Sequence, residues 1–190
     1  MVATEKPFLM SVEDVFRRSQ GRVVRVTGRI ERGRVSKDDE VELVGFDADA
    51  IAVVADIDDG GRSVGEAHSG MNVGLVLQGV PAGAIERGHV LAAPGWVTAH
   101  LGFAADMAVL SEEEGGAQVL TGQRLCFYAR AAAVWGEVAL PDGFEAIQPL
   151  GKGTVTVMLE RPVALEEGQV LAFRHHGRAA GYGTVVRLLR

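Results

Sequence analysis

The segment RVVRVTGRIERG, residues 22–33, alternates apolar and polar side chains. Val24, Val26 and Ile30 fall on one side of an extended chain, and the arginine and threonine residues between them fall on the other. A period of two residues is the pattern of a β-strand with one buried face and one face in water. The segment therefore predicts a half-buried strand.

The same pattern recurs along the chain, and the 25 glycines are spread through it, as is typical of short strands joined by tight turns. We therefore predict an all-β fold. Only SVEDVFRR, residues 11–18, favours a short helix, with Ser11 as the N-cap, Glu13 and Asp14 in the first turn and arginines at the end. The other strand-like segments are EVELVGF (40–46), MNVGLVLQGV (71–80), FAADMAVL (103–110), RLCFYARAAAVWGEVAL (124–140) and GTVTVMLERPVAL (153–165).

Two similar halves are indicated by an internal echo and by a break near the midpoint. ERGHVLA begins at Glu86 and EEGQVLA at Glu166, and each places a glycine turn before a short apolar strand. Pro94 and Gly95 interrupt the strand pattern in AAPGWVTAH, residues 92–100. We predict two consecutive small antiparallel β-barrels over residues 1–95 and 96–190, because closing a sheet removes its exposed edges.

Composition excludes several classes of protein. Hydrophobic residues make up 47% of the 190 and charged residues 23%, which are the values of a globular domain. The net charge of −6 gives no overall positive field for nucleic acid, so we expect no DNA partner and only local RNA contacts, from basic residues at 17–29 and 174–190. Those residues are equally explained as solvated outer faces. No apolar run approaches a membrane span, and the lone Cys126 with no secretory signal pattern favours the cytoplasm.

A search for reactive groups finds no active site. AIQPLGKGT, residues 146–154, lacks both the first glycine and the hydroxyl of a phosphate-binding loop. His175 and His176 are adjacent and would point to opposite sides of a strand, which is poor geometry for one metal ion. Cys126 lies in an apolar strand pattern and is interpreted as a buried, inert thiol. We expect no catalytic residue, no metal and no cofactor.

The order of ten short segments is more specific than any one of them, because together they closely resemble the second and third domains of bacterial elongation factor Tu. The resemblance runs from Lys6 to Arg190 and implies two β-barrels of the domain II and domain III type. It also implies that the GTP-binding domain of the family is absent from this sequence. The segments are KPFLMSVEDVF, VTGRIERG, DEVELVGF, NVGLVLQGV, IERGHVLAAPG, EEGG, FYAR, GEVALPDG, ERPVALEEG and GRAAGYGTVV.

The resemblance implies a pocket for the aminoacylated 3′ end of tRNA at Glu13, Asp14, Phe16, Thr27 and Asn72. An aromatic ring can pack on a base, and carboxylate, hydroxyl and amide groups can receive an amino group and adenosine. Structural roles are the alternative: Phe16 in the core, Thr27 on a strand face, Asn72 in a turn, and the two acids at a helix start.

The resemblance also implies contacts to the tRNA stem from Arg178 and Gly181. Ala117 and Gln118 stand where the family has Arg-His, and Gln78 replaces an arginine. Fewer basic contacts mean weaker and more salt-sensitive RNA binding.

Two functional hypotheses follow. The first is a GTPase-less relative of elongation factor Tu that binds aminoacyl-tRNA or a tRNA-like RNA in an accessory or regulatory translation role. The second is a protein-interaction module that docks a separate GTPase, a ribosomal component or a regulatory partner without binding RNA. An enzymatic activity has no supporting residues.

Overall fold

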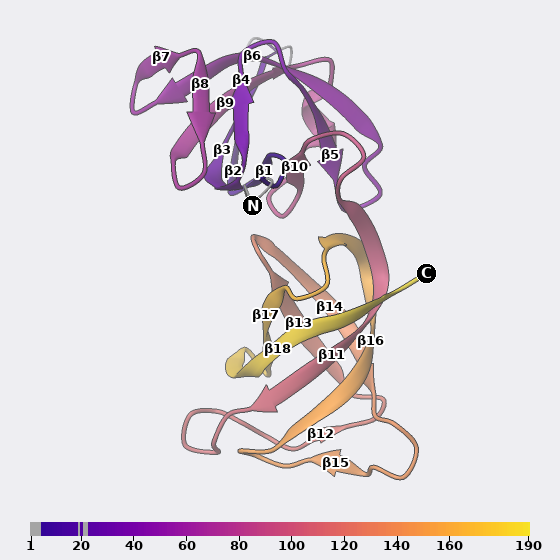
Figure 1. Cartoon of the computed structure of the whole chain (residues 1–190). Helices are drawn as coiled ribbons and strands as arrows, with labels where there is room; N and C mark the ends of the chain where they lie inside the picture. Colours follow the sequence, from indigo (N-terminus) through magenta and orange to yellow (C-terminus); the bar gives the residue numbers. More distant parts are fainter. Residues whose placement is uncertain (1–4, 19, 21–22) are drawn as a thin grey trace. The chain divides into compact units, whose positions relative to one another are not determined.

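The computed structural model describes residues 5–18, 20 and 23–190 (Figure 1). The chain divides into two compact units, Met1–Thr98 and Ala99–Arg190. Each unit contains one closed antiparallel barrel, so the prediction of an all-β fold with two small barrels is confirmed. In the described part of the chain no helix is long and apolar enough to cross a membrane.

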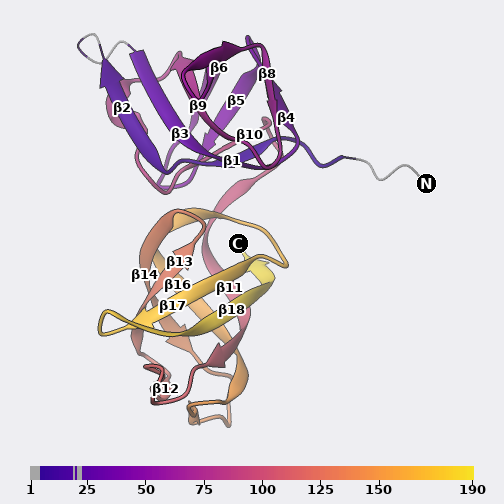
Figure 2. The same ribbon diagram turned by 90° about the vertical axis from the view of Figure 1, so that its left-hand side faces the viewer.

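The first barrel closes through six strands in the order β1-β10-β5-β6-β9-β3, with β3 pairing back to β1. β2 extends the sheet beside β3, as Figure 2 shows, and β7 extends it beside β6. A separate ribbon pairs β4 with β8, and a 3-10 turn covers Ala82–Ala84. The strands are β1 (Leu9–Ser11), β2 (Asp14–Arg18), β3 (Val23–Arg32), β4 (Arg34–Ser36), β5 (Glu40–Val44), β6 (Ala50–Asp59), β7 (Arg62–Val64), β8 (Glu66–His68), β9 (Asn72–Gln78) and β10 (Val90–Ala92).

The second barrel closes through β11-β16-β14-β13-β17-β18 and back to β11. A small two-stranded ribbon, β12 with β15, is visible below it in Figure 1. The strands are β11 (Thr98–Val109), β12 (Val119–Leu120), β13 (Arg124–Ala129), β14 (Ala132–Ala139), β15 (Ala146–Ile147), β16 (Lys152–Leu165), β17 (Val170–His175) and β18 (Arg178–Leu189).

The segment 22–33 forms β3 from Val23 onward, while Arg22 lies outside the described residues. Val24, Val26 and Ile30 are fully buried in the core of the first barrel. Phe8 and Val12, from the stretch that enters this barrel, join the same core. The alternation of the sequence therefore separates the core face from the outer face.

The internal echo corresponds to one repeated turn. At residues 86–89 the His89 ring nitrogen bonds the Glu86 N–H at 3.0 Å, and at 166–169 the Gln169 side-chain oxygen accepts from the Glu166 N–H at 3.1 Å. In each turn the backbone N–H of the fourth residue donates back to the carbonyl of the first. The glycines between them, Gly88 and Gly168, have φ of 102° and 84°. β10 begins directly after the first of these turns and β17 directly after the second.

The predicted helix over 11–18 is wrong. Residues 14–18 form β2, which pairs with β3 from Asp14 opposite Thr27 to Arg18 opposite Val23. The pattern of capping residues is compatible with a helix. The segment forms a strand because it makes backbone hydrogen bonds to β3, and this tertiary pairing outweighs the local helix preference.

Candidate nucleic-acid interface

Four of the five residues predicted for the 3′-end pocket belong to one outer surface of the first barrel. Asp14 lies opposite Thr27, and Phe16 lies opposite Arg25, in the pairing of β2 with β3. Directly opposed residues of an antiparallel pair project to the same side. That side is the outer one, because Val24 and its inward-facing neighbours are fully buried. We call this surface, built on β2, β3 and β9, the outer sheet.

Asn72 and Glu13 complete the predicted set in different ways. Asn72 begins β9 opposite Arg29, on the outer side and exposed. Glu13 precedes β2, and its backbone N–H donates to the Thr27 carbonyl at 2.9 Å. Its own carbonyl accepts from Arg87 Nη1 at 3.2 Å, which leaves the exposed carboxylate outside the ladder.

The structure separates these residues from most of the structural roles that were the alternative. Phe16 is 48% exposed, so it is not a core residue, and the two acids do not begin a helix. Asn72 lies in a strand instead of a turn, whereas Thr27 is a half-buried strand-face residue, as its alternative states. The structure brings four of the five predicted residues, Asp14, Phe16, Thr27 and Asn72, to one side of the sheet.

Arg25 lies in the same surface; the sequence places it among the basic residues at 17–29 but not in the predicted 3′-end pocket. Its Nη2 donates to Asp58 Oδ2 of β6, and its guanidinium carbon lies 5.8 Å from the centroid of the Phe16 ring. Asp58 is held in turn by the Gly61 N–H, which donates to Oδ1 at 2.7 Å. Asp56 and Asp14 add two more carboxylates to this surface, and the Ser63 hydroxyl bond lowers the pKa of Asp56. The surface therefore offers acceptors for amino groups around one fixed arginine.

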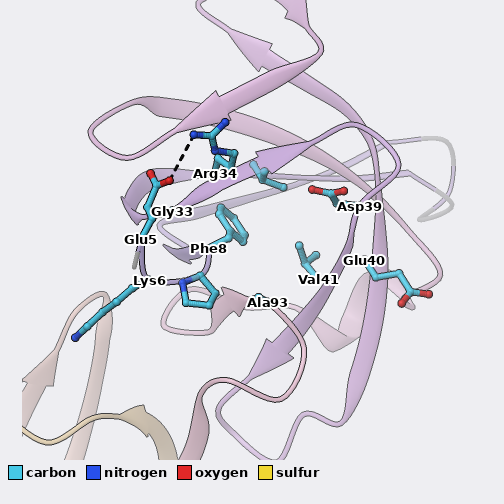
Figure 3. A pocket seen from close by; sticks show the side chains of 11 residues that line it. Glu5, Lys6, Phe8, Gly33, Arg34, Asp39, Glu40, Val41 and Ala93 are labelled. Carbon is cyan, nitrogen blue, oxygen red and sulfur yellow. Dashed lines mark hydrogen bonds and ion pairs between the residues drawn. The ribbon is translucent and has the colours of Figure 1, made fainter. Parts of the chain in front are cut away.

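A hollow of about 260 Å³ opens elsewhere on the first barrel (Figure 3). Phe8, Val35 and Val41 form its apolar part, and an ion pair of 3.4 Å between Arg34 and Glu5 crosses its wall. None of the residues predicted for the 3′-end pocket lines it.

The second barrel carries arginines packed on aromatic rings over its outer surface. The Arg124 guanidinium carbon lies 4.6 Å from the Trp135 ring centroid, and that of Arg174 lies 5.0 Å from the Tyr128 ring centroid. Half-buried Cys126 lies between the pairs, opposite Trp135 on one side and Arg174 on the other. We call this surface the arginine–aromatic face. Arginine and aromatic planes are the groups on which unpaired bases stack.

Residues 96–189 match the family model of the elongation factor Tu C-terminal domain. The match runs through every strand from β11 to β18, so the second unit is similar to a translation-factor domain. The first barrel lies outside the matched residues, so its correspondence to the second domain of the family stays a prediction.

Within the second barrel, the two predicted stem-binding residues have different surroundings. Arg178 is exposed at the start of β18 and lies beside the loop at Gly115, where an added Cβ would be 3.7 Å from its Nε. Gly181 is buried, and a Cβ there would lie 2.2 Å from the Ala108 carbonyl oxygen and 2.5 Å from the Phe173 ring. Close packing inside the barrel accounts for this glycine, whereas the Arg178 side chain is exposed to solvent.

The two adjacent histidines of this domain differ from the geometry expected. β17 ends at His175, and His176 turns the chain with φ of 50°, so the rings lie together with centroids 4.1 Å apart instead of on opposite sides. The Gln123 amide nitrogen is 3.3 Å from His175 Nε2. Burial, followed by the charge of His176, lowers the pKa of His175.

No group of three potential ligands for a metal ion occurs among the described side chains. Lys152 and Thr154, from the segment tested as a phosphate loop, lie in the extended start of β16.

Proposed function

We propose that the chain is an elongation-factor-Tu-like module that binds aminoacyl-tRNA or a related RNA, in an accessory or regulatory translation role. The observation that carries the proposal is the outer sheet, where Asp14, Phe16, Thr27 and Asn72 share one exposed neighbourhood. A base can stack on Phe16, and the carboxylates can receive the amino group of an aminoacyl ester. The match of the second barrel to a translation-factor domain supports the same class of ligand.

The arginine–aromatic face gives the second barrel a means of contacting RNA. Arg174 packs on Tyr128, and the turn that follows at His176 leads to exposed Arg178 at the start of β18. No carboxylate within salt-bridge distance of Arg174 or Arg178 is found in the described part of the chain. These arginines can therefore neutralise phosphates, which gives RNA binding that weakens as salt rises.

The test is a binding titration of the full chain with aminoacylated and deacylated tRNA at low salt, followed by fluorescence anisotropy. Replacing Phe16 with alanine removes the stacking surface, and loss of base–aromatic stacking of about 1–3 kcal/mol corresponds to roughly 5- to 150-fold weaker binding. Ile51→Ala is the matched control, since Ile51 is 45% exposed on β6 of the same barrel. Failure of the wild-type protein to bind either RNA at tens of micromolar would refute the proposal.

A second candidate is a protein-interaction module, favoured by the composition of the arginine–aromatic face. Tryptophan, tyrosine and arginine are the residue types that dominate binding energy at protein interfaces. The net charge of −6 also makes RNA attraction a local effect only. This candidate predicts a partner that remains bound after nuclease treatment of the lysate and is lost from the Trp135→Ala variant.

A further inference from the structure

Arg25 lies across the middle of the outer sheet, in a slot that a glycine leaves open. It leaves β3 opposite Val76 of β9 and reaches Asp58 of β6, two inter-strand spacings of about 4.8 Å away. The guanidinium passes over Gly74, where an added Cβ would lie 2.6 Å from Arg25 Nε. Gly74 does not have the left-handed backbone that requires glycine, so its missing side chain makes room for the guanidinium.

The hydrogen bonding of Arg25 in this slot is incomplete. Nη2 donates to Asp58, but Nε is buried and has no acceptor. A buried donor without an acceptor is destabilising. By contrast Arg130 of the second barrel, whose side chain is more deeply buried than that of Arg25, donates from its terminal nitrogens to Ala164, Gln169 and Glu166. Displacing Arg25 from its slot would therefore expose its Nε–H to water, where it gains a hydrogen-bond acceptor.

The groups around Arg25 are those that a flat ring bearing an amino group would use. A guanidinium is planar, donates N–H bonds and packs on aromatic faces. Phe16 offers a ring for stacking, Gly74 offers space, and Asp58, fixed by the Gly61 N–H, offers a carboxylate that accepts from an amino group. A nucleobase with an exocyclic amino group is likewise planar, stacks on aromatic rings and donates N–H bonds.

We propose that Arg25 is an internal occupant of a base-binding slot on the outer sheet, and that it lowers the affinity for an amino-bearing base by competing with it for Phe16 and Asp58. This inference rests on the proposed function, because it assigns part of the RNA surface. Arg25 then sets specificity: only a ligand that stacks on Phe16 and donates to Asp58 displaces it.

The test depends on the direction in which RNA affinity changes when Arg25 is removed, because electrostatics alone predicts the opposite direction. Removing an arginine from an RNA-binding surface weakens binding, since a phosphate contact is lost. Arg25→Ala should instead bind an RNA hairpin with a single-stranded 3′ tail ending in adenosine at least threefold more tightly than wild type. Arg62→Ala, which removes the same charge from exposed β7, should bind no more tightly than wild type. Weaker or unchanged binding by Arg25→Ala would overturn the inference.

Free nucleosides separate this inference from the proposed function. Adenosine should raise the melting temperature of Arg25→Ala, whereas purine riboside, which lacks the amino group, should not. The double variant Arg25→Ala/Gly74→Ala should lose the adenosine effect, because its new Cβ fills the slot. If adenosine raises the melting temperature of Arg25→Ala while the wild-type protein binds no tRNA, the base-binding slot is supported and the proposed function is refuted. If Arg25→Ala folds with a normal urea midpoint and ignores adenosine, the slot is refuted whatever the tRNA result.

Discussion

Arg130 should be the most destabilising side chain to remove from the turns of the second barrel. Its side chain is 9% exposed; Nη2 donates to Glu166 Oε2 and Nη1 to Gln169 Oε1, both at 2.9 Å, and Nη1 also donates to the Ala164 carbonyl at 3.2 Å. These bonds tie the β13–β14 turn to the end of β16 and the start of β17. Arg130→Ala leaves all three acceptors without this donor.

The size of the effect follows from burial. Removing one partner of a buried ion pair costs roughly 3–5 kcal/mol. The Glu166 side chain is 29% exposed and can be hydrated after the loss, so we expect the lower limit, about 3 kcal/mol. Arg130 also has φ of 54°, a left-handed conformation that costs an L-residue roughly 1–2 kcal/mol. Arg130→Gly relieves that cost and should be the more stable variant by about 1 kcal/mol.

Urea and thermal unfolding, followed by circular dichroism and tryptophan fluorescence, measure both variants. For a unit of this length each kcal/mol shifts the melting temperature by about 4–8 °C, so Arg130→Ala should lower the second unit's transition by about 12–24 °C. The transition of the first barrel is the internal control, because Arg130 and its three acceptors all lie in the second unit. A loss below about 1 kcal/mol, the size of an average substitution, would refute the conclusion that the Arg130 bonds stabilise these turns.

Three further outcomes are expected. Gly181→Ala should destabilise the second barrel by about 1–3 kcal/mol or more, because its Cβ would lie 2.2 Å from a backbone oxygen; urea midpoints check this. Because burial lowers the pKa of His175 in the fold, the unfolded chain binds the proton more tightly; stability should fall as pH drops through about 6.5, and His175→Gln should lessen that fall. Arg178→Gln should reduce the salt slope of RNA binding by about one unit, measured as log affinity against log salt, and an unchanged slope would remove Arg178 from the interface.

The alternation of apolar and polar residues predicts the core of this protein well, because that alternation follows directly from which side chains are buried. The alternation in 22–33 separates buried Val24 and Val26 from outward Arg25 and Thr27, as β3 does. The alternation does not predict a turn whose position depends on contacts with distant residues. Residues 124–140 contain no proline and no glycine before Gly136, yet the chain turns at Arg130 between β13 and β14. The left-handed backbone there is held by the bonds of its side chain to distant residues, which no local pattern contains.

Register is the reason why the sequence could predict only part of the candidate site. The resemblance to a known family selected Asp14, Phe16 and Thr27, and their pairing places them together. Arg25 had the same alternation but no motif, and its importance depends on Gly74 and Asp58 lying beside it from two other strands. The arginine–aromatic pairs of the second barrel likewise depend on which strands are neighbours. The alternation in RLCFYAR does indicate that residues 124, 126 and 128 share one face. It does not show which aromatic rings and arginines of the neighbouring strands lie opposite them.

The repeated turn explains why similarity between the halves is uninformative about function. At Glu86 and at Glu166 the echo preserves the glutamate and the glycine of a tight turn and one leucine that enters the core, Leu91 in the first barrel and Leu171 in the second. Any barrel strand that follows a tight turn needs both roles. The charged and aromatic residues of the outer surfaces follow no such echo: one barrel presents carboxylates around Arg25, and the other presents arginines on Trp135 and Tyr128. Because folding constrains the inward set and leaves the outward set free, a shared architecture does not imply a shared ligand. Function has to be tested separately on the two surfaces, with outward substitutions that leave both cores intact.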